Sequence, residues 1–88
     1  MNLILAALNN TTRLQLIQCL SQKPKSVSEM IAVCNLSQSA VSQHLSKLRK
    51  AGLVTTEKKG KIIYYSLAYP QLKELSLSLQ RFIQEVQI

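Results

Sequence analysis

The most constraining feature of the sequence is a pair of amphipathic segments, separated by only two residues, with a change of period directly after them. Residues 27–34 carry apolar side chains at positions i, i+3, i+4 and i+7, and residues 37–50 carry them at i, i+4 and i+7. Both spacings place the apolar side chains on one face of a helix. Residues 53–67 instead form two β-rich runs around a polar loop that contains Gly60, which predicts a hairpin. Helix, tight turn, helix and hairpin in this order predict a winged helix-turn-helix.

Residues typical of helix ends lie at the borders of these segments. Ser26 or Ser28 can cap the first helix, and Glu29 stands three residues after Ser26, as in a capping box. Asn35 directly follows that helix and, after glycine, is the residue that best tolerates a left-handed helix end. Ser37 is a good N-cap for the second helix. We therefore expect a short turn that holds the second helix across the first.

Three further helices are predicted around this unit. Residues 2–8 form a short apolar helix, residues 11–21 form an amphipathic one, and Pro70 stands in the first turn of the last helix. That last helix carries an apolar stripe: Leu72, Leu75, Leu79, Phe82 and Val86. The fold class predicted is mainly α with a small β-hairpin (α+β), in one domain over residues 1–88. Its parts are a helix-turn-helix at about 27–50, a wing at about 53–67 and a C-terminal dimerisation helix at about 71–87.

The charge of the chain favours an anionic partner. Its 88 residues include 11 Lys and Arg against 4 Asp and Glu, a formal net charge of +7. More than half of the basic residues lie within residues 44–61: Lys47, Arg49, Lys50, Lys58, Lys59 and Lys61. A basic cluster on the second helix of a helix-turn-helix and on the hairpin tip predicts contact with double-stranded DNA.

The outward face of the second helix is expected to read the DNA. It holds no apolar residue and no acid, and a Gln side chain can pair bidentately with adenine in the major groove. The lysines of the hairpin tip are expected to reach the phosphate backbone or the adjacent minor groove. The predicted DNA-binding residues are Ser37, Gln38, Ser39, Ser42, Gln43, His44, Lys47, Arg49, Lys58, Lys59 and Lys61.

Three stretches carry a family resemblance: LAALNNTTRLQLIQCL, LSQSAVSQHLSKLRKAGLV and KKGKIIYYSL. They resemble the opening, the recognition helix and the wing of the ArsR/SmtB family of bacterial repressors, and together they cover essentially the whole chain. The resemblance implies a homodimer joined through the first and last helices and bound to an imperfect inverted repeat at a promoter. It also implies repression that an inducer relieves. The predicted interface residues are Leu3, Ile4, Leu72, Leu75, Leu79, Phe82 and Val86. For the stripe of the last helix, the alternative is that it closes the core of its own chain.

The chain departs from that family at the positions of its metal sites. Where metal-sensing members have a Cys-x-Cys pair before the turn, this chain has Ser26 and Ser28. Along the last helix, the ligand positions of other members are occupied here by Tyr69, Gln71, Phe82 and Glu85. One carboxylate does not make a zinc site, because zinc takes three or four well-placed ligands. No metal and no cofactor are therefore predicted.

The two cysteines and the single histidine are interpreted separately. Cys34 lies on the apolar stripe of its helix and is expected to pack in the core. Cys19 lies off the centre of its helix's apolar face, which leaves passive packing and a redox role both open. A second branch of the family senses oxidants through a cysteine pair between the second and last helices, and the last helix here has no cysteine. His44 has no metal-binding neighbour, so a structural or phosphate-contacting role is expected.

Other classes of function are excluded or kept as alternatives. The four carboxylates are scattered and no nucleophile has a neighbouring base by motif, so no enzyme is predicted. No apolar run reaches the roughly 20 residues of a membrane span, and MNLILAAL lacks the flanks of a signal peptide. We therefore expect a cytoplasmic protein without membrane contact. A winged-helix module that binds proteins instead of DNA is one alternative, and a repressor that responds to thiol oxidation through Cys19 is another.

Overall fold

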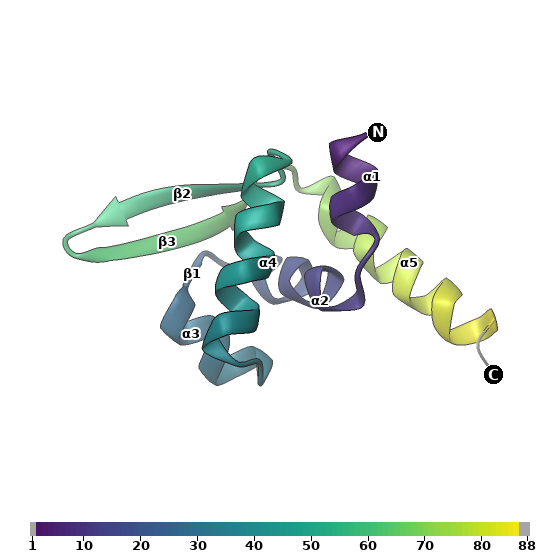
Figure 1. Cartoon of the computed structure of the whole chain (residues 1–88), viewed down its shortest axis with the longest axis horizontal. Helices are drawn as coiled ribbons and strands as arrows, with labels where there is room; N and C mark the ends of the chain where they lie inside the picture. Colours follow the sequence, from purple (N-terminus) through teal and green to yellow (C-terminus); the bar gives the residue numbers. More distant parts are fainter. Residues whose placement is uncertain (1, 87–88) are drawn as a thin grey trace.

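The computed structural model describes residues 2–86, which form five helices and a small antiparallel sheet (Figure 1). In chain order the elements are α1 (Leu3–Leu8), α2 (Thr11–Leu20), β1 (Lys25–Ser26), α3 (Val27–Cys34), α4 (Gln38–Lys50), β2 (Val54–Lys59), β3 (Ile62–Leu67) and α5 (Gln71–Val86). Each predicted helix and the hairpin agree with these bounds to within one residue. Residue 87 of the predicted last helix lies outside the described residues. The mainly α fold with a small wing is confirmed.

Asparagine side chains begin the first two helices. Oδ1 of Asn2 accepts a hydrogen bond from the backbone N–H of Ile4 at 2.9 Å, and Oδ1 of Asn10 accepts one from the N–H of Arg13 at 3.1 Å. Asn10 has extended backbone angles, so the chain changes direction between the two helices. This is why residues 3–20 form two helices instead of one.

The turn between α3 and α4 has the predicted caps. Oγ of Ser26 accepts from the N–H of Glu29 at 3.2 Å, and the Glu29 carboxylate accepts from the N–H of Ser26 at 3.0 Å, which completes the capping box. Asn35 ends α3 in the left-handed region with φ of 55°. Ser37 then caps α4 by accepting from the N–H of Ala40 at 3.2 Å. Local chemistry at these residues sets the crossing of α4 over α3.

The wing is the hairpin of β2 and β3, which is antiparallel and pairs Glu57 with Tyr64. Gly60 lies at its tip with φ of 64°, a conformation that favours glycine. β1 pairs with the other edge of β3, so the sheet has the order β1-β3-β2. β1 was not predicted from the sequence, because a strand of two residues is too short to show an alternating pattern.

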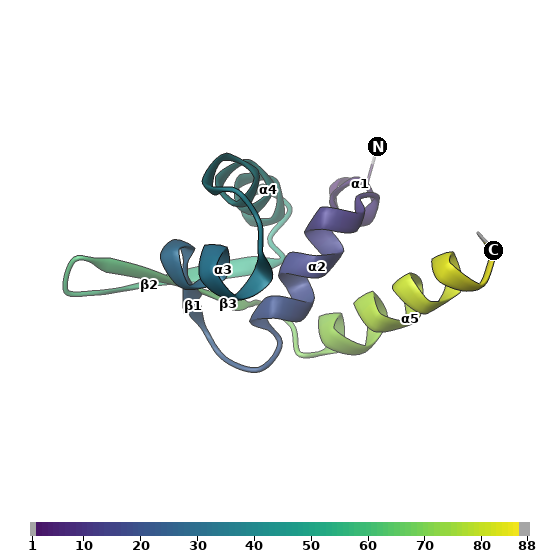
Figure 2. The same cartoon turned by 90° about the horizontal axis from the view of Figure 1, so that it is seen from below.

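The core lies where α2 crosses the middle of the molecule, between the α3–α4 pair and α5 (Figure 2). Its most deeply buried apolar side chains are Leu14, Leu16, Ile17, Met30, Val41, Leu45, Leu48 and Leu53. Tyr65 and Leu67 of β3 pack against this core. Ile63 is 47% exposed, because it lies farther out along the wing.

α5 packs against α2 at its start and then extends away from the body of the molecule (Figures 1 and 2). Leu72 is buried in the chain's own core and is only 5% exposed, and Leu79 is half-buried. Leu75, Phe82 and Val86 are exposed by 45%, 62% and 64%. The predicted stripe is thus divided: Leu72 closes the core, Leu79 packs against it, and the other three residues are exposed.

Candidate nucleic-acid interface

α4 has a buried apolar side and an exposed polar side. Val41, Leu45 and Leu48 are at most 2% exposed and hold the helix on the core. Arg49, in the last turn of α4, is exposed. The exposed residues of α4 include a set of polar and basic ones: Gln38, Ser39, Ser42, Gln43, Ser46 and Lys47. Their amide, hydroxyl and ammonium groups are of the kinds that hydrogen-bond to base edges and phosphates.

The N-terminus of α4 carries two exposed serine hydroxyls. Oγ of Ser37 accepts from the N–H of Ala40 and lies 3.4 Å from Oγ of Ser39. The first turn of a helix presents free backbone N–H groups and the positive end of the helix dipole. The predicted residue Ser37 therefore lies where a phosphate group would be stabilised.

The wing tip is strongly basic. Lys58, Lys59 and Lys61 are all exposed, and Glu57 is the one acid in β2 and β3. The Lys59 ammonium lies 5.9 Å from the centroid of the Tyr64 ring, within the range of a cation–π contact. The Tyr64 ring therefore lies beside the basic wing tip, a placement that was not predicted from the sequence.

His44 is placed differently from the other predicted contact residues, because its ring is partly buried and faces Arg13. Nη1 of Arg13 lies 3.2 Å from Nδ1 of His44. Burial, followed by the positive charges of Arg13 and Lys47, lowers the pKa of His44 below its usual value. The neutral ring can then accept a hydrogen bond from Arg13 through Nδ1. Of the two roles expected for His44, the structure favours the structural one.

Arg13 is a residue that the sequence analysis missed. Its side chain is only 7% exposed, and it donates from Nε to the carbonyl of Ala7 at 2.6 Å and from Nη2 to that of Ala6 at 3.1 Å. Arg13 thereby ties the last turn of α1 to α2 and, through His44, to α4. The one signal for it was its place in the resemblance to the family's opening stretch, since a lone basic residue on an amphipathic helix is ordinarily solvated.

Cys19 and Cys34 form a disulfide between α2 and α3, with their Cα atoms 6.4 Å apart. Both side chains are half-buried and pack against the core. This pairing corrects the prediction from the sequence, in which Cys19 and Cys34 have separate roles. The pairing depends on how α3 packs on α2, which a separation of 15 residues does not reveal.

An apolar groove of about 330 Å³ lies between α1 and α5. It is lined mainly by Leu5, Leu8, Leu14, Leu75, Leu79 and Ile83. Other exposed apolar side chains on the same two helices are Leu3, Ile4, Phe82 and Val86. An apolar surface of this size on a small domain is typical of an interface.

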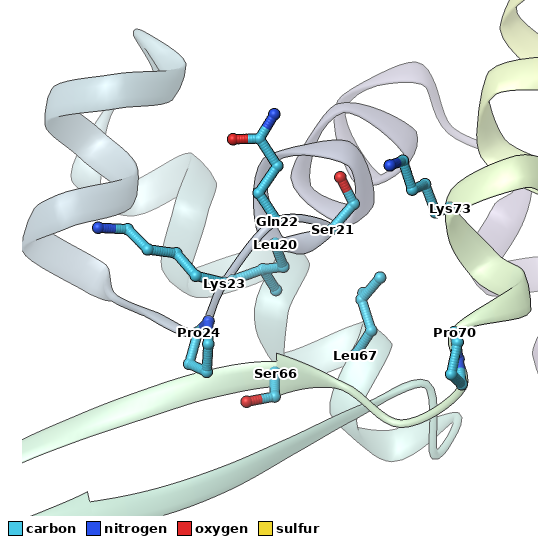
Figure 3. A pocket seen from close by; sticks show the side chains of 9 residues that line it. All are labelled: Leu20, Ser21, Gln22, Lys23, Pro24, Ser66, Leu67, Pro70 and Lys73. Atoms are coloured by element: carbon cyan, nitrogen blue, oxygen red, sulfur yellow. The ribbon is translucent and has the colours of Figure 1, made fainter.

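Residues 2–86 contain no group of three His, Cys, Asp or Glu side chains placed to hold a metal ion. A hollow of about 330 Å³ lies between the α2–β1 loop, β3 and the start of α5. Figure 3 shows Lys23 and Lys73 on opposite sides of it, with Leu20 and Leu67 between them. The side chains that line this hollow include no carboxylate, thiol or imidazole. Within residues 2–86, no helix has the length and hydropathy of a membrane span.

Residues 10–56 match a family model described as "Bacterial regulatory protein, arsR family". This match covers more than half of the chain and includes α2, α3 and α4. The chain is also 40% identical over 78 residues to the transcriptional activator HlyU of Vibrio cholerae serotype O1, which corresponds to 89% of this chain and 72% of that protein. It spans only 51% to 54% of the length of several other regulators that it matches.

Solved structures of two similar proteins have the same fold. The transcriptional regulator HlyU from Vibrio vulnificus CMCP6 superposes with a TM-score of 0.76 at 41% identity, over 91% of this chain and 83% of that one. The homodimeric winged helix-turn-helix DNA-binding domain of Mb0332 from Mycobacterium bovis superposes with a TM-score of 0.77 at 26% identity, over 97% of this chain and 79% of that one. The winged helix-turn-helix predicted from the sequence is thus confirmed.

Proposed function

We propose, since the chain belongs to the ArsR family of bacterial regulatory proteins, that it is a homodimeric repressor which binds an inverted-repeat operator. Family membership makes it a DNA-binding transcriptional regulator and not an enzyme. The observation that supports binding to an operator is the amphipathic character of α4. Its apolar side is buried, its polar side is exposed, and a basic wing tip follows it in the chain.

α4 enters the major groove with its exposed polar side toward the base edges. Gln and Ser side chains read bases there through hydrogen bonds, and a Gln can form two bonds to one adenine. The base-reading residues are Gln38, Ser39, Ser42 and Gln43. Their support is exposure: all four side chains are exposed, whereas Val41 and Leu45 of the same helix are buried.

The backbone of the DNA is held by the N-terminus of α4, the C-terminal end of α4 and the wing. Ser37 offers the first-turn N–H groups to one phosphate. Lysine and arginine bind further phosphates and release their counterions, so binding weakens steeply with added salt. The residues in this role are Lys47, Arg49, Lys58, Lys59 and Lys61, all of which are exposed.

Two copies of the chain pair through α1 and α5. The support is the apolar groove between these helices together with exposed Leu3, Ile4, Phe82 and Val86. Pairing removes this surface from water, which stabilises the dimer. Leu75 and Leu79, which line the groove, belong to the same interface, whereas Leu72 supports it from within the core. A two-fold dimer presents two copies of α4, which suits an inverted repeat.

Selection of bound duplexes from a randomised DNA library tests the proposal. We expect an enriched inverted repeat bound by two chains, with half-sites about one helical turn apart. Failure to enrich any sequence would favour the alternative of a protein-binding module without a DNA role. A reporter under the selected operator then fixes the direction of regulation, because the Vibrio cholerae relative bears the name of an activator. Lower reporter expression with the protein present supports repression, and higher expression contradicts it.

The Cys19–Cys34 disulfide favours a second, finer function, a repressor that responds to thiol oxidation. With hydrogen peroxide as oxidant, the two thiols lose two electrons and two protons, the S–S bond forms, and the peroxide is reduced to two water molecules. The bond ties α3, on which α4 rests, to α2. Oxidation therefore changes the freedom of the helix pair that carries the DNA-reading surface.

Operator binding by reduced and peroxide-treated protein tests this second function. We expect a change of affinity of about fivefold or more in the wild type, the lower range of a typical coupling between two sites. Cys19→Ser and Cys34→Ser are matched controls, and neither should respond to peroxide. Equal affinities of the reduced and oxidised wild type would contradict the function, provided that mass spectrometry verifies the bond in the oxidised sample.

A further inference from the structure

A small pocket lies between α1 and the C-terminal end of α4, and its lining combines apolar walls with three cations. Its volume is about 220 Å³. Leu3, Ala6, Ala7 and Ala51 form the apolar walls. The cationic side chains are Arg13, Lys47 and Lys50, and no acid lines the pocket. We call this space the α1–α4 pocket.

Arg13 is the key side chain of the α1–α4 pocket, because its guanidinium is buried without a negative partner among the described residues. Its three hydrogen-bond partners there are the carbonyls of Ala6 and Ala7 and the ring of His44, all of them uncharged. A guanidinium has five N–H donors, so two of them have no partner within residues 2–86. A buried charge is stabilised most by an ion of opposite sign with matching hydrogen bonds.

Lys47 and Lys50 extend the positive charge to the outer side of the same pocket. Both belong to the last turn of α4, where their ammonium groups are exposed to solvent. An anion that entered the α1–α4 pocket would meet the flat guanidinium inside and two flexible ammonium groups outside. The uncharged part of the anion would pack against the alanine and leucine walls. Burial of this apolar surface would add to the binding free energy of the charge contact.

We propose that the α1–α4 pocket binds a small organic carboxylate with an apolar body. The carboxylate accepts from the free N–H groups of Arg13, and Lys47 and Lys50 neutralise it from the solvent side. The apolar body lies against Ala6, Ala7 and Ala51. A carboxylate suits the fork of the guanidinium, which binds planar anions through two parallel hydrogen bonds.

Binding at the α1–α4 pocket has a consequence that rests on the proposed function. Lys47 is one of the residues assigned to phosphate contact, and a carboxylate in the pocket neutralises its charge. Occupancy then weakens operator binding. By thermodynamic reciprocity, operator DNA weakens carboxylate binding by the same factor.

Titration of the ¹⁵N-labelled 88-residue chain with sodium benzoate, followed by NMR, tests the site without DNA. Benzamide is the control probe, because it has the same ring and size but no charge. We expect saturable shifts of the Ala6, Ala7 and Ala51 amides with benzoate, with a dissociation constant on the order of 1 mM for a ligand this small. Benzamide should cause no saturable shift. Equal responses to both probes, or linear shifts without saturation, would overturn the proposal.

Variants locate the binding within the molecule. Lys50→Gln should weaken the binding of benzoate about threefold, as expected for the loss of one exposed charge contact. The double variant with Lys47→Gln and Lys50→Gln should weaken it about tenfold. Ala51→Leu, which fills the pocket without changing charge, should abolish binding. Lys73→Gln should have no effect, because Lys73 lines the separate hollow beside β3 and not the α1–α4 pocket. Unchanged affinity in Ala51→Leu would overturn the site. Inorganic phosphate as a further probe should bind more weakly than benzoate, and equal or tighter binding would overturn the assignment to an organic acid.

A separate arm measures operator binding with and without benzoate. If benzoate binds but operator affinity stays constant, the site stands and only its coupling to DNA is rejected. If the protein binds no operator, the proposed function fails while the NMR result still decides the α1–α4 pocket.

Discussion

Nη1 of Arg13 lies 3.2 Å from Nδ1 of His44, and this contact joins α2 to α4 across 31 residues of sequence. Two further N–H groups of the same guanidinium are bonded to the last turn of α1. Three helices thus meet at one buried side chain. The position of α4, and with it the surface that we propose to read DNA, therefore depends on a contact that lies behind that surface.

The Arg13–His44 contact makes stability depend on pH in a predictable direction. The pKa of His44 is lower in the folded chain than in the unfolded one, mainly because of burial and then because of Arg13 and Lys47. The contribution of His44 is therefore fully present above a pH of about 6.5 and is lost as the pH falls through the folded-state pKa. We expect the free energy of unfolding in urea to fall more steeply between pH 7.5 and pH 5 in the wild type than in His44→Asn. The asparagine keeps an acceptor but does not titrate, so parallel pH profiles would contradict the account.

The left-handed turn at Asn35 predicts a matched pair of effects on stability. Asn35→Ala should lower the free energy of unfolding by about 1 kcal/mol, because alanine lacks the short polar side chain whose local hydrogen bonds help asparagine to adopt a φ of 55°. Asn35→Gly should leave it nearly unchanged or raise it slightly, because glycine adopts this conformation freely. Urea denaturation of both variants measures the difference. Equal stabilities would show that the turn is not held in the left-handed region.

Phe82 is expected to contribute to pairing between two copies, because it is 62% exposed on α5. Phe82→Asp should raise the dissociation constant of the dimer about 30-fold or more, the effect of losing a central interface residue. Gln84→Asp adds the same charge to an exposed position of the same helix and serves as the control. Sedimentation equilibrium measures both variants. A Phe82→Asp protein that dimerises like the wild type would exclude this face of α5 from the interface.

Loss of the Lys59 charge is expected to change the salt dependence of DNA binding without changing the preference for particular DNA sequences. Lys59→Gln should weaken binding to all duplexes by similar factors and reduce the slope of log affinity against log salt concentration by about 1, since one phosphate contact is lost. Lys23→Gln removes an equal charge from the loop before β1 and should leave the slope unchanged. Titrations at several salt concentrations decide between these results. A slope that falls equally in both variants would mean that only net charge matters.

The sequence predicted the helix-turn-helix well because its borders are set by neighbouring residues. Ser26 with Glu29, Asn35 and Ser37 each act on a backbone group within three residues, so their roles could be read from local spacing. The exposed side of α4 followed from the helical period in the same way, because Val41, Leu45 and Leu48 fix which side is buried.

Contacts between distant segments could not be predicted from local spacing. The Arg13–His44 contact and the Cys19–Cys34 bond each depend on how α2 packs against another helix. The apolar stripe of α5 showed that the helix is amphipathic. It did not show that Leu72 closes the core while Phe82 faces outward, because that division depends on where α5 leaves the body.

The most direct test of the account is the base preference of Gln43→Ala. Affinities of wild type and variant are measured against a series of operators, each with one base pair changed symmetrically in both half-sites. We predict that the variant loses about 1–3 kcal/mol of discrimination at one position of each half-site and keeps its preference at all others. It should also keep the wild-type salt slope, because no phosphate contact is removed. An unchanged preference at every position would contradict the placement of α4 in the major groove.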